Sequence, residues 1–239
     1  MTAIIGDLGG ESGALFRLIQ KLPKGRRVFV GDLPDRGNGT PEIINWAMSQ
    51  TDDVFLMGNH EHMMVDFCDG VKKYHPADWL VNGGLQTLIS YGFEPKEELV
   101  IWEGRMQCHV LNKAVSEPAK HFAEMNVPKA HVEWLRKRPY FYEEPGLYVS
   151  HAPWPSNTKL GEIPEPRGFS EMAHPDLALW NRSAPRKREG VLQVFGHNSA
   201  EWNLKWFDDW AVCIDDTKHH RKLTALIWPS REIIQESFG

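Results

Sequence analysis

The stretch Val28-Phe29-Val30-Gly31-Asp32-Leu33-Pro34-Asp35-Arg36-Gly37 is the most informative about the fold, because an apolar run passes directly into glycine and a carboxylate. The same pattern occurs at Ala3-Ile4-Ile5-Gly6-Asp7, and residues 54–57 lead into Gly58-Asn59-His60-Glu61. A buried strand that ends in glycine and a polar side chain presents that side chain at the carboxyl edge of a sheet, where α/β folds bind their ligands. The sequence therefore predicts strands whose ends meet at one site.

Helical periods alternate with these apolar runs. Strands are expected over residues 3–6, 27–30 and 53–57, and helices over residues 10–21, 39–48 and 61–67. This alternation predicts a βαβαβα opening with parallel strands.

The rest of the chain predicts a second sheet. Short strand candidates joined by turns are typical of antiparallel pairing, and they lie at residues 99–102, 107–111, 141, 147–150, 191–195, 210–214 and 223–228. Asn82-Gly83-Gly84 is expected to end or interrupt a helix, and residues 153–166, rich in Pro, Gly and Asn, predict a long loop.

Five side chains are candidate metal ligands, because carboxylate oxygen, amide oxygen and imidazole nitrogen suit Mn, Fe, Zn or Mg. They are Asp7, Asp32, Asn59, His151 and His197. Taken singly, an Asp after a strand is more often a helix cap or a turn former, and a lone His is more often structural. Five of them in this order favour a cluster, and two ions about 3.5 to 4 Å apart can clamp an in-line displacement at phosphorus.

The ordered set of Gly-Asp, Gly-Asp-x-x-Asp-Arg-Gly, Gly-Asn-His-Glu, His151-Ala152 and Gly196-His197 resembles the calcineurin-type metallophosphoesterase superfamily. More narrowly, residues 59–64, 79–84 and 179–182 are similar to the bacteriophage lambda type of serine/threonine protein phosphatase. The resemblance runs from about Ile4 to Ile227. It implies an α/β fold, a four-layer αββα sandwich of two mixed sheets with helices outside. One domain is expected over residues 1–239, with a small helical cap insertion at about residues 74–139.

The resemblance also implies a binuclear metal centre. Asp32 would bridge two divalent ions, Asp7 would belong to the first ion, and Asn59, His151 and His197 would complete the second. The expected ion is Mn, with Fe, Zn, Mg or Ni as alternatives, and the implied nucleophile is a water or hydroxide held between the ions.

Four further residues match the catalytic positions of the family. His60 would protonate the departing oxygen, and Asp35 would hold the imidazole in the useful tautomer. Arg36 and Arg182 match the two phosphate-binding arginines, since a guanidinium fork suits a tetrahedral oxyanion. Individually such residues are commonly a helix-start turn or a surface ion pair.

One departure weakens the expected first metal site. The family reads Gly-Asp-x-His-Gly, whereas this chain reads Gly6-Asp7-Leu8-Gly9-Gly10, and Gly9 offers no side chain. The family variant with a second His two residues after Gly-His is also absent, because Ser199 stands there. Asp7 and Asp32 are then the remaining ligands.

Several explanations stay open for this departure. The first ion could bind loosely with water in its shell, or Glu11 or the pair His219-His220 could supply a ligand. Alternatively the chain has lost turnover and binds a phosphorylated ligand without cleaving it. The sequence does not separate a natural Gly9 from an engineered one.

Hydrolysis of a phosphomonoester, by a serine/threonine protein phosphatase that could also accept phosphotyrosine, is the leading prediction, with a phosphorylated protein or peptide as partner. The alternatives are a nucleotide or dinucleoside polyphosphate phosphohydrolase and a weakened or inactive phosphate-binding relative. A working enzyme is favoured, because a chain without chemistry would have little reason to keep His60, Asp35, Arg36 and Arg182.

Composition agrees with one enzyme domain. The 239 residues are 41% hydrophobic, enough for a sizeable core. A net charge of -5 argues against a general nucleic-acid or acidic-membrane binder. The three cysteines, Cys68, Cys108 and Cys213, are widely spaced and predict no disulfide framework. With no apolar run of membrane-spanning length and a predicted strand at the very start, a cytoplasmic location is expected. The oligomeric state is not predicted.

Overall fold

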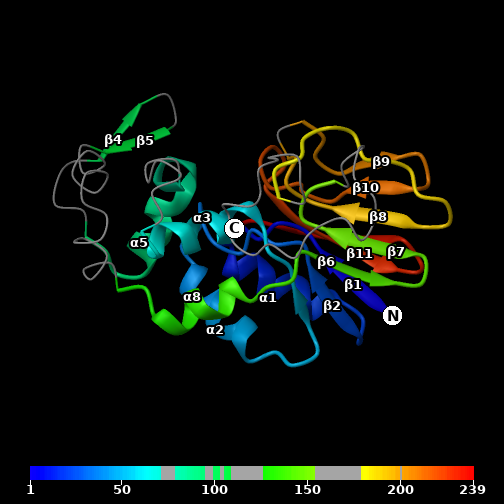
Figure 1. Ribbon diagram of the computed structural model, residues 1–239, viewed down its shortest axis with the longest axis horizontal. Coiled ribbons are helices and arrows are strands. Elements are labelled where there is room, and N and C mark those ends of the chain that lie inside the picture. The colour runs from blue at the N-terminus through cyan, green and yellow to red at the C-terminus, as the bar shows by residue number, and fades with distance from the viewer. Residues whose placement is uncertain (71–78, 95–98, 103–104, 109–125, 154–178, 200) are drawn as a thin grey trace.

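The computed structural model describes residues 1–70, 79–94, 99–102, 105–108, 126–153, 179–199 and 201–239 (Figure 1). The strands are β1 (Thr2–Ile5), β2 (Arg26–Phe29), β3 (Val54–Phe55), β4 (Leu99–Trp102), β5 (Arg105–Cys108), β6 (Phe141–Glu144), β7 (Leu147–Ser150), β8 (Leu192–Phe195), β9 (Lys205–Phe207), β10 (Ala211–Cys213), β11 (Lys222–Trp228) and β12 (Glu232–Ser237). The helices are α1 (Ser12–Lys21), α2 (Thr40–Met48), α3 (Asn59–Cys68), the π-helical turn η1 (Leu80–Gly84), α5 (Leu85–Ser90) and α8 (Lys129–Arg136).

The first sheet has the strand order β12-β11-β1-β2-β3. Strands β1, β2 and β3 are parallel, and helices α1 and α2 connect them, so the predicted βαβαβα opening is confirmed. Strand β11 pairs antiparallel with β1, which places the predicted strand 223–228 in the first sheet rather than the second. Strand β12 was not expected from the sequence, and it pairs antiparallel with β11 at the sheet edge.

The second sheet has the order β6-β7-β8-β10-β9 and is mixed. Strands β7, β8 and β10 are parallel, whereas the hairpin β6-β7 and the pair β9-β10 are antiparallel. The expectation of an antiparallel second sheet is therefore wrong for its centre. The connection from Ser150 to Leu192 is long enough to return the chain to the starting end of the sheet, as parallel pairing requires.

The two sheets pack face to face around one apolar layer. Both sheets contribute fully buried side chains to this layer, including Ile4, Val28 and Leu226 from the first sheet and Val149, Val194 and Val212 from the second. On the other face of the first sheet, α1 and α2 cover Ile5, Phe29 and Phe55 with Leu15, Leu18 and Ile43. These layers confirm the predicted sandwich of two mixed sheets (Figure 1).

A helical region built from α3, η1, α5 and α8 lies beside the sheets, at the left of Figure 1. It has its own buried cluster, which includes Met64, Trp79, Leu88 and Leu135. Gly83 has φ 120° inside η1, so the predicted interruption at Asn82-Gly83-Gly84 is confirmed. Much of the expected cap at residues 74–139 lies outside the described residues, as does nearly all of the expected loop at residues 153–166, and the single-domain assignment stays a prediction.

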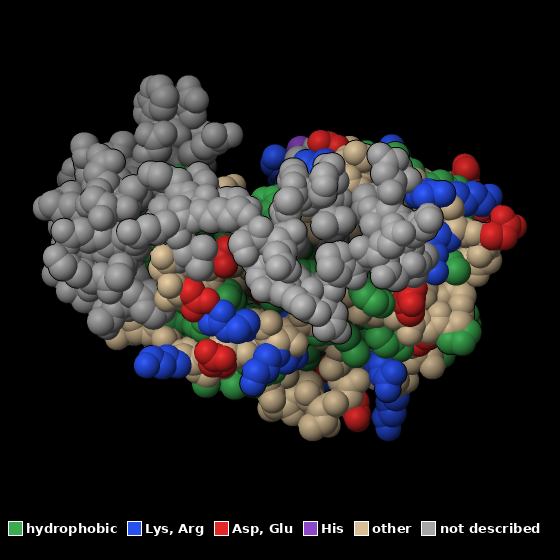
Figure 2. Space-filling model, viewed as in Figure 1, with side chains coloured by type: hydrophobic (Ala, Val, Ile, Leu, Met, Phe, Trp, Pro, Cys, Tyr) green, Lys and Arg blue, Asp and Glu red, His purple; other side chains and the backbone are tan. Residues whose placement is uncertain are grey.

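The described surface shows no concentration of one charge on the face seen in Figure 2, where Lys and Arg side chains are interspersed with Asp and Glu. Among the described helices, none combines the length and the apolar character needed to cross a bilayer.

Candidate metal centre

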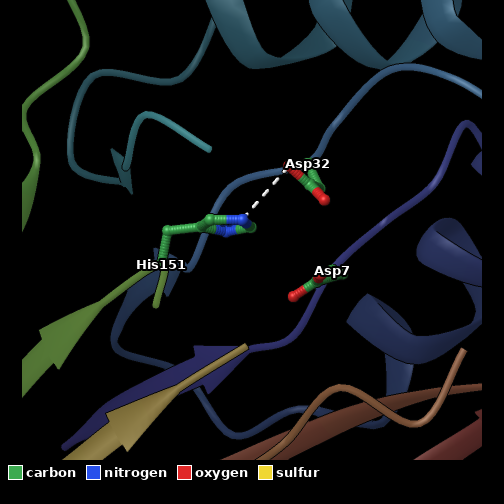
Figure 3. A group of neighbouring side chains, drawn as sticks. All are labelled: Asp7, Asp32 and His151. Carbon is green, nitrogen blue, oxygen red and sulfur yellow. Dashed lines mark ion pairs between the residues drawn. The ribbon is translucent and has the colours of Figure 1, made fainter. Parts of the chain in front are cut away.

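The five predicted ligands meet where the two sheets present their carboxyl ends. Asp7 follows β1, Asp32 follows β2, His151 follows β7, and the remaining two follow β3 and β8. All are buried, with exposed fractions of 1% for Asp7, 3% for Asp32, 3% for Asn59, 0% for His151 and 6% for His197. Ligand atoms of Asp7, Asp32 and His151 lie within 4.8 Å of one another, and these side chains point toward a common point in Figure 3.

The hydrogen bonds of His151 determine which ring nitrogen carries the proton. Its Nδ1 lies 3.0 Å from the carbonyl oxygen of Val30, so Nδ1–H donates there. Burial lowers the pKa of His151, and the neutral ring then has a lone pair on Nε2. That lone pair faces Asn59 Oδ1 at 2.8 Å and Asp32 Oδ1 at 3.4 Å. Three acceptors therefore converge with no proton between them, an arrangement that a cation stabilises.

His197 lies beside these acceptors, and its neutral ring offers one further nitrogen lone pair. Its Nδ1 lies 2.9 Å from Asn59 Oδ1, while its buried Nε2 has no hydrogen-bond partner among the described residues. Burial, reinforced by His151 and Arg182, lowers the pKa of His197 to about 2, so the ring is neutral at physiological pH. Neutral imidazole is the form that binds a divalent ion.

The two carboxylates of the cluster have opposite pKa shifts. Burial raises the pKa of Asp7, and the nearby Asp215 and Asp32 raise it further. Burial alone would raise the pKa of Asp32 as well, but His151 and His60 lower it below its usual range. A divalent ion would remove the repulsion between Asp7 and Asp32, so the residues present fit a metal.

Glu61, on the first turn of α3, links the loop that carries Asp32 to Gly58, the residue before Asn59. Its Oε2 accepts the backbone N–H of Asp32 at 2.9 Å and that of Gly58 at 2.8 Å, and its Oε1 accepts the N–H of Leu33 at 2.5 Å. Burial and the charge of Asp32 raise the pKa of Glu61 to about 8. The three N–H donors favour the ionised carboxylate and oppose that rise.

His60 lies beside the cluster and is paired with Asp35. Its Nδ1 is 2.5 Å from Asp35 Oδ2, and its Nε2 is 3.0 Å from Arg36 Nη2 and 3.7 Å from Asp32 Oδ2. Burial lowers the pKa of His60, but Asp32 and Asp35 outweigh it and the net shift is upward. The imidazole thus directs Nε2 toward the metal-ligand cluster, where a leaving group could receive a proton.

The two predicted arginines are exposed at the rim of this buried centre. Arg36 follows Asp35 directly, and the Nη1 of Arg182 donates to Asn198 Oδ1 at 3.2 Å and to the carbonyl oxygen of His197 at 3.5 Å. The loop of Arg182 is anchored by Asn181, whose Nδ2 donates to the carbonyl oxygen of Pro153 at 2.9 Å. Exposed guanidinium groups in these positions can meet an incoming phosphate.

Gly9 leaves an open position in the first motif. It has φ +54°, and a Cβ built there would have no described atom within 4 Å. The group of neighbouring carboxylate and imidazole ligand atoms includes neither Glu11 nor the pair His219-His220. The side chain of His220 is 59% exposed and pairs with Asp216 at 2.6 Å. Within the described residues, the two predicted sources of a borrowed ligand are thus not part of the cluster.

Asp215 and Asn198 were missed by the sequence reasoning. Asp215 is buried, accepts the N–H of Ser199 at 2.9 Å and lies close enough to Asp7 to raise its pKa. It follows the apolar strand β10, so the strand-then-carboxylate pattern used for Asp7 and Asp32 would have found it. Asn198, which contacts Arg182, carries no such pattern.

A family model, calcineurin-like phosphoesterase, matches residues 2–215. This chain belongs to that family. Two curated relatives, from Methylobacillus flagellatus and Chromobacterium violaceum, are both described as symmetrical bis(5'-nucleosyl)-tetraphosphatases. The first is 26% identical over 63% of this chain and 42% of its own length. The second is 24% identical over 92% of this chain and 65% of its own length. The chain thus spans less than two thirds of either relative.

Solved structures share the fold at low identity. A candidate diadenosine tetraphosphatase superposes with a TM-score of 0.60 at 15% identity, covering 98% of this chain and 91% of that one. A protein serine/threonine phosphatase from Saccharomyces cerevisiae gives a TM-score of 0.53 at 13% identity, covering 99% of this chain and 79% of that one. The predicted superfamily is confirmed, whereas the narrower likeness to the phage lambda type stays a prediction.

Proposed function

We propose that this protein is a metal-dependent phosphohydrolase that cleaves a dinucleoside polyphosphate. The observation that carries the proposal is the convergence of His151 Nε2, Asn59 Oδ1 and Asp32 Oδ1 without a proton between them. The substrate class is supported by the two curated relatives, both described as acting on bis(5'-nucleosyl) tetraphosphates. This choice replaces the protein phosphatase that the sequence motifs favour.

The second ion would be held by Asp32, Asn59, His151 and His197, and Asp7 and Asp32 would hold the first, weaker ion. When bound, a divalent ion polarises a phosphoryl oxygen and lowers the pKa of water toward neutrality. Mn is the expected ion, with Fe, Zn, Mg and Ni as alternatives. The oxygen-only pair of Asp7 and Asp32 suits Mn or Mg better than Zn.

The residues of the chain supply binding and proton transfer. Arg36 and Arg182 would bind the non-bridging oxygens of the phosphate that is attacked. The oxygen of a water molecule forms a bond to phosphorus and gives up a proton to solvent, the P–O bond to the leaving phosphate breaks, and His60, carrying a proton on each ring nitrogen, donates the Nε2 proton to the leaving oxygen. Asp35 holds the proton on His60 Nδ1 throughout. No covalent intermediate on the protein is required.

The substrate class is tested by incubating the Mn-loaded protein with diadenosine tetraphosphate, p-nitrophenyl phosphate and a phosphoserine peptide, and separating the products by ion-exchange chromatography. Symmetrical cleavage of the tetraphosphate yields two molecules of ADP and is the expected main reaction. Cleavage to ATP and AMP would contradict the symmetrical reaction. Absence of any tetraphosphate hydrolysis would sink the proposed substrate class.

A protein phosphatase is the second candidate, because residues 59–64, 79–84 and 179–182 resemble the phage lambda type. The same assay separates the two, since this candidate predicts that the phosphoserine peptide is the best substrate. Binding of phosphate without turnover on all three compounds would instead favour an inactive relative in which Gly9 has removed a needed ligand.

A further inference from the structure

The carboxylate of Asp35 is held on three sides by described residues. Its Oδ2 accepts the Nδ1–H of His60 at 2.5 Å and the Nε1–H of Trp79 at 2.9 Å. Its Oδ1 accepts the hydroxyl of Thr87 at 2.7 Å. Asp35 and Thr87 are both fully buried and Trp79 is 2% exposed, so water does not substitute for these bonds. The orientation of Asp35 therefore depends on Trp79 and Thr87.

Thr87 also binds the backbone of the residue that it orients. The N–H of Asp35 donates to Thr87 Oγ1 at 2.8 Å, while the same hydroxyl donates to the carboxylate. Asp35 has φ 76°, a left-handed conformation that most residues with a side chain avoid. The paired bonds to Thr87 stabilise this backbone conformation, which aims the carboxylate at His60.

Trp79 and Thr87 both belong to the helical region rather than to the sheets that carry the metal ligands. Trp79 immediately precedes η1, and Thr87 lies in α5. The kink at Gly83 lets this region pack closely against the Asp35 loop. A Cβ at Gly83 would lie 2.8 Å from Arg36 N and 3.0 Å from Asp35 Cβ, which is too close. The N–H of Arg36 also donates to the carbonyl oxygen of Gly83 at 3.4 Å. The helical region and the Asp35 loop are therefore in close contact at Gly83, with no room for a side chain there.

We infer that Thr87 and Trp79 are positioning residues for His60, acting through Asp35. By fixing the Asp35 carboxylate they keep one proton on His60 Nδ1, so that the second proton of the imidazolium is carried on Nε2, which is directed at the reacting phosphate. The consequence for catalysis rests on the proposed function, whereas the consequence for the imidazole tautomer does not. Neither residue touches the substrate in this account, so both act on proton transfer and leave metal binding alone.

Thr87→Val and Thr87→Ser separate a positioning role from a packing role. Val keeps the size of the side chain and removes the hydroxyl, whereas Ser keeps the hydroxyl and removes a buried methyl group. The positioning role predicts that Thr87→Val lowers turnover of phenyl phosphate by about tenfold while changing p-nitrophenyl phosphate less than about twofold, because p-nitrophenolate leaves with little need of a proton. Thr87→Ser should keep the wild-type ratio of the phenyl phosphate rate to the p-nitrophenyl phosphate rate. A packing role instead predicts that Thr87→Ser, which loses the buried methyl group, lowers turnover of both substrates more than Thr87→Val does.

Trp79→Phe extends the test, since it removes the Nε1–H donor and keeps an aromatic ring. Trp79→Phe should lower the ratio of the phenyl phosphate rate to the p-nitrophenyl phosphate rate, as Thr87→Val does. His60→Asn sets the largest shift that loss of the acid can cause. Thr224→Val is the matched control, because Thr224 is a buried threonine whose hydroxyl accepts a bond from Gln235 in the first sheet. It should leave the rate ratio unchanged.

The tautomer is read directly by 15N NMR of histidine-labelled protein loaded with diamagnetic Mg²⁺. At a pH high enough for the ring to be neutral, His60 should show the Nδ1–H tautomer in the wild type and in Thr87→Ser, and a mixture of tautomers in Thr87→Val. Wild-type tautomer and wild-type rate ratio in both Thr87→Val and Trp79→Phe would overturn the inference. A chain that hydrolyses no phosphoester would sink the proposed function alone, because the tautomer measurement needs no turnover.

Discussion

At the scale of single residues, Gly9 is the position where this chain differs most from the family pattern. Its surroundings are open and its neighbour Asp7 has a raised pKa from burial and from Asp215 and Asp32. A nitrogen ligand at residue 9 would add a partner for an ion bound by Asp7. We therefore expect the first ion to bind weakly, and a nitrogen ligand introduced at residue 9 to strengthen its binding.

Gly9→His should tighten binding of the first ion by about tenfold or more, measured by calorimetric titration with Mn²⁺. The left-handed φ of +54° should cost roughly 1 kcal/mol of the free energy of unfolding, since His is among the residues that tolerate this region. Gly70→His is a matched control, because Gly70 has φ +66° and equally open surroundings at the end of α3. If both variants bind Mn²⁺ like the wild type, the first ion is held in some other way.

The sequence pattern led to those residues of the candidate site that follow apolar runs, and it gave no indication of contacts between residues far apart in the chain. Asp7, Asp32 and Asn59 each follow a strand by two to four residues, and that local pattern is visible in the chain. Thr87 binds Asp35 across 52 positions, and nothing in the neighbourhood of either residue indicates the partner. Contacts of this kind follow from how the helical region docks, which local periodicity does not encode.

At the scale of elements, α3 is the helix that connects the metal centre to the core. Its first turn carries Asn59, His60 and Glu61, and its later residues Met64, Val65 and Phe67 are buried in the helical region. Glu61 fixes the start of this helix to the loop after β2 through three backbone N–H groups.

Glu61→Gln should lower the free energy of unfolding by about 1 to 3 kcal/mol, because the amide has one acceptor oxygen and would turn an N–H donor toward a backbone N–H. Urea denaturation monitored by tryptophan fluorescence measures the change. Glu133→Gln on α8 is the control, since the Glu133 side chain is 61% exposed and its ion pair with Arg136 is long, at 3.8 Å. Equal stability of the two variants would contradict the role given to Glu61.

A hydrogen bond of the buried His131 imidazole links helix α8 to α2. His131 is 4% exposed, its Nδ1 lies 2.7 Å from the hydroxyl of Tyr91, and its Nε2 lies 3.0 Å from Asn45 Oδ1. Burial raises the pKa of Tyr91, so its hydroxyl keeps its proton and donates to Nδ1. The neutral ring then donates from Nε2 to Asn45, and burial lowers the pKa of His131 accordingly.

The lowered pKa gives a defined dependence of stability on pH. Above about pH 6.5 the ring is neutral in both states, and below it the unfolded chain takes up a proton that the folded chain resists. Stability should therefore fall as pH decreases from 6.5 toward the lowered folded pKa, with a contribution of at most about 1.4 kcal/mol per pH unit. Denaturation at pH 7.0, 6.0 and 5.0 should give a shallower slope for His131→Gln than for the wild type. Identical slopes would show that His131 protonates normally in the folded protein.

The elements also show what sequence patterns settle and what they leave open. Helices α1, α2 and α3 and strands β1 to β3 were predicted because each has a clear apolar period and a glycine or proline boundary. The pairing of β7, β8 and β10 was predicted wrongly, because the direction of a strand depends on the connection that precedes it. Strand β12 carries Glu232, Gln235 and Glu236, and its polar edge gave no strand signal.

At the scale of the whole molecule, the ligands come from both sheets and from residues as far apart as Asp7 and His197. Strands β1, β2 and β3 of the first sheet and β7 and β8 of the second all end at this point. A bound ion would therefore link the two sheets and stabilise the folded chain over the unfolded one, which has no such site. The gain at a hundredfold excess over the dissociation constant is about 2.7 kcal/mol.

Whether these side chains bind a divalent ion is measured on the dialysed wild type and Asp32→Asn, by elemental analysis for the metal content and by calorimetric titration for the Mn²⁺ affinity. Asp52→Asn, at an exposed position before β3, serves as control. We predict at least one tightly held ion per wild-type chain and per control chain, and an affinity weaker by more than about 100-fold in Asp32→Asn. A wild-type chain that retains and binds no divalent ion, or an Asp32→Asn chain that binds it equally well, would contradict the account.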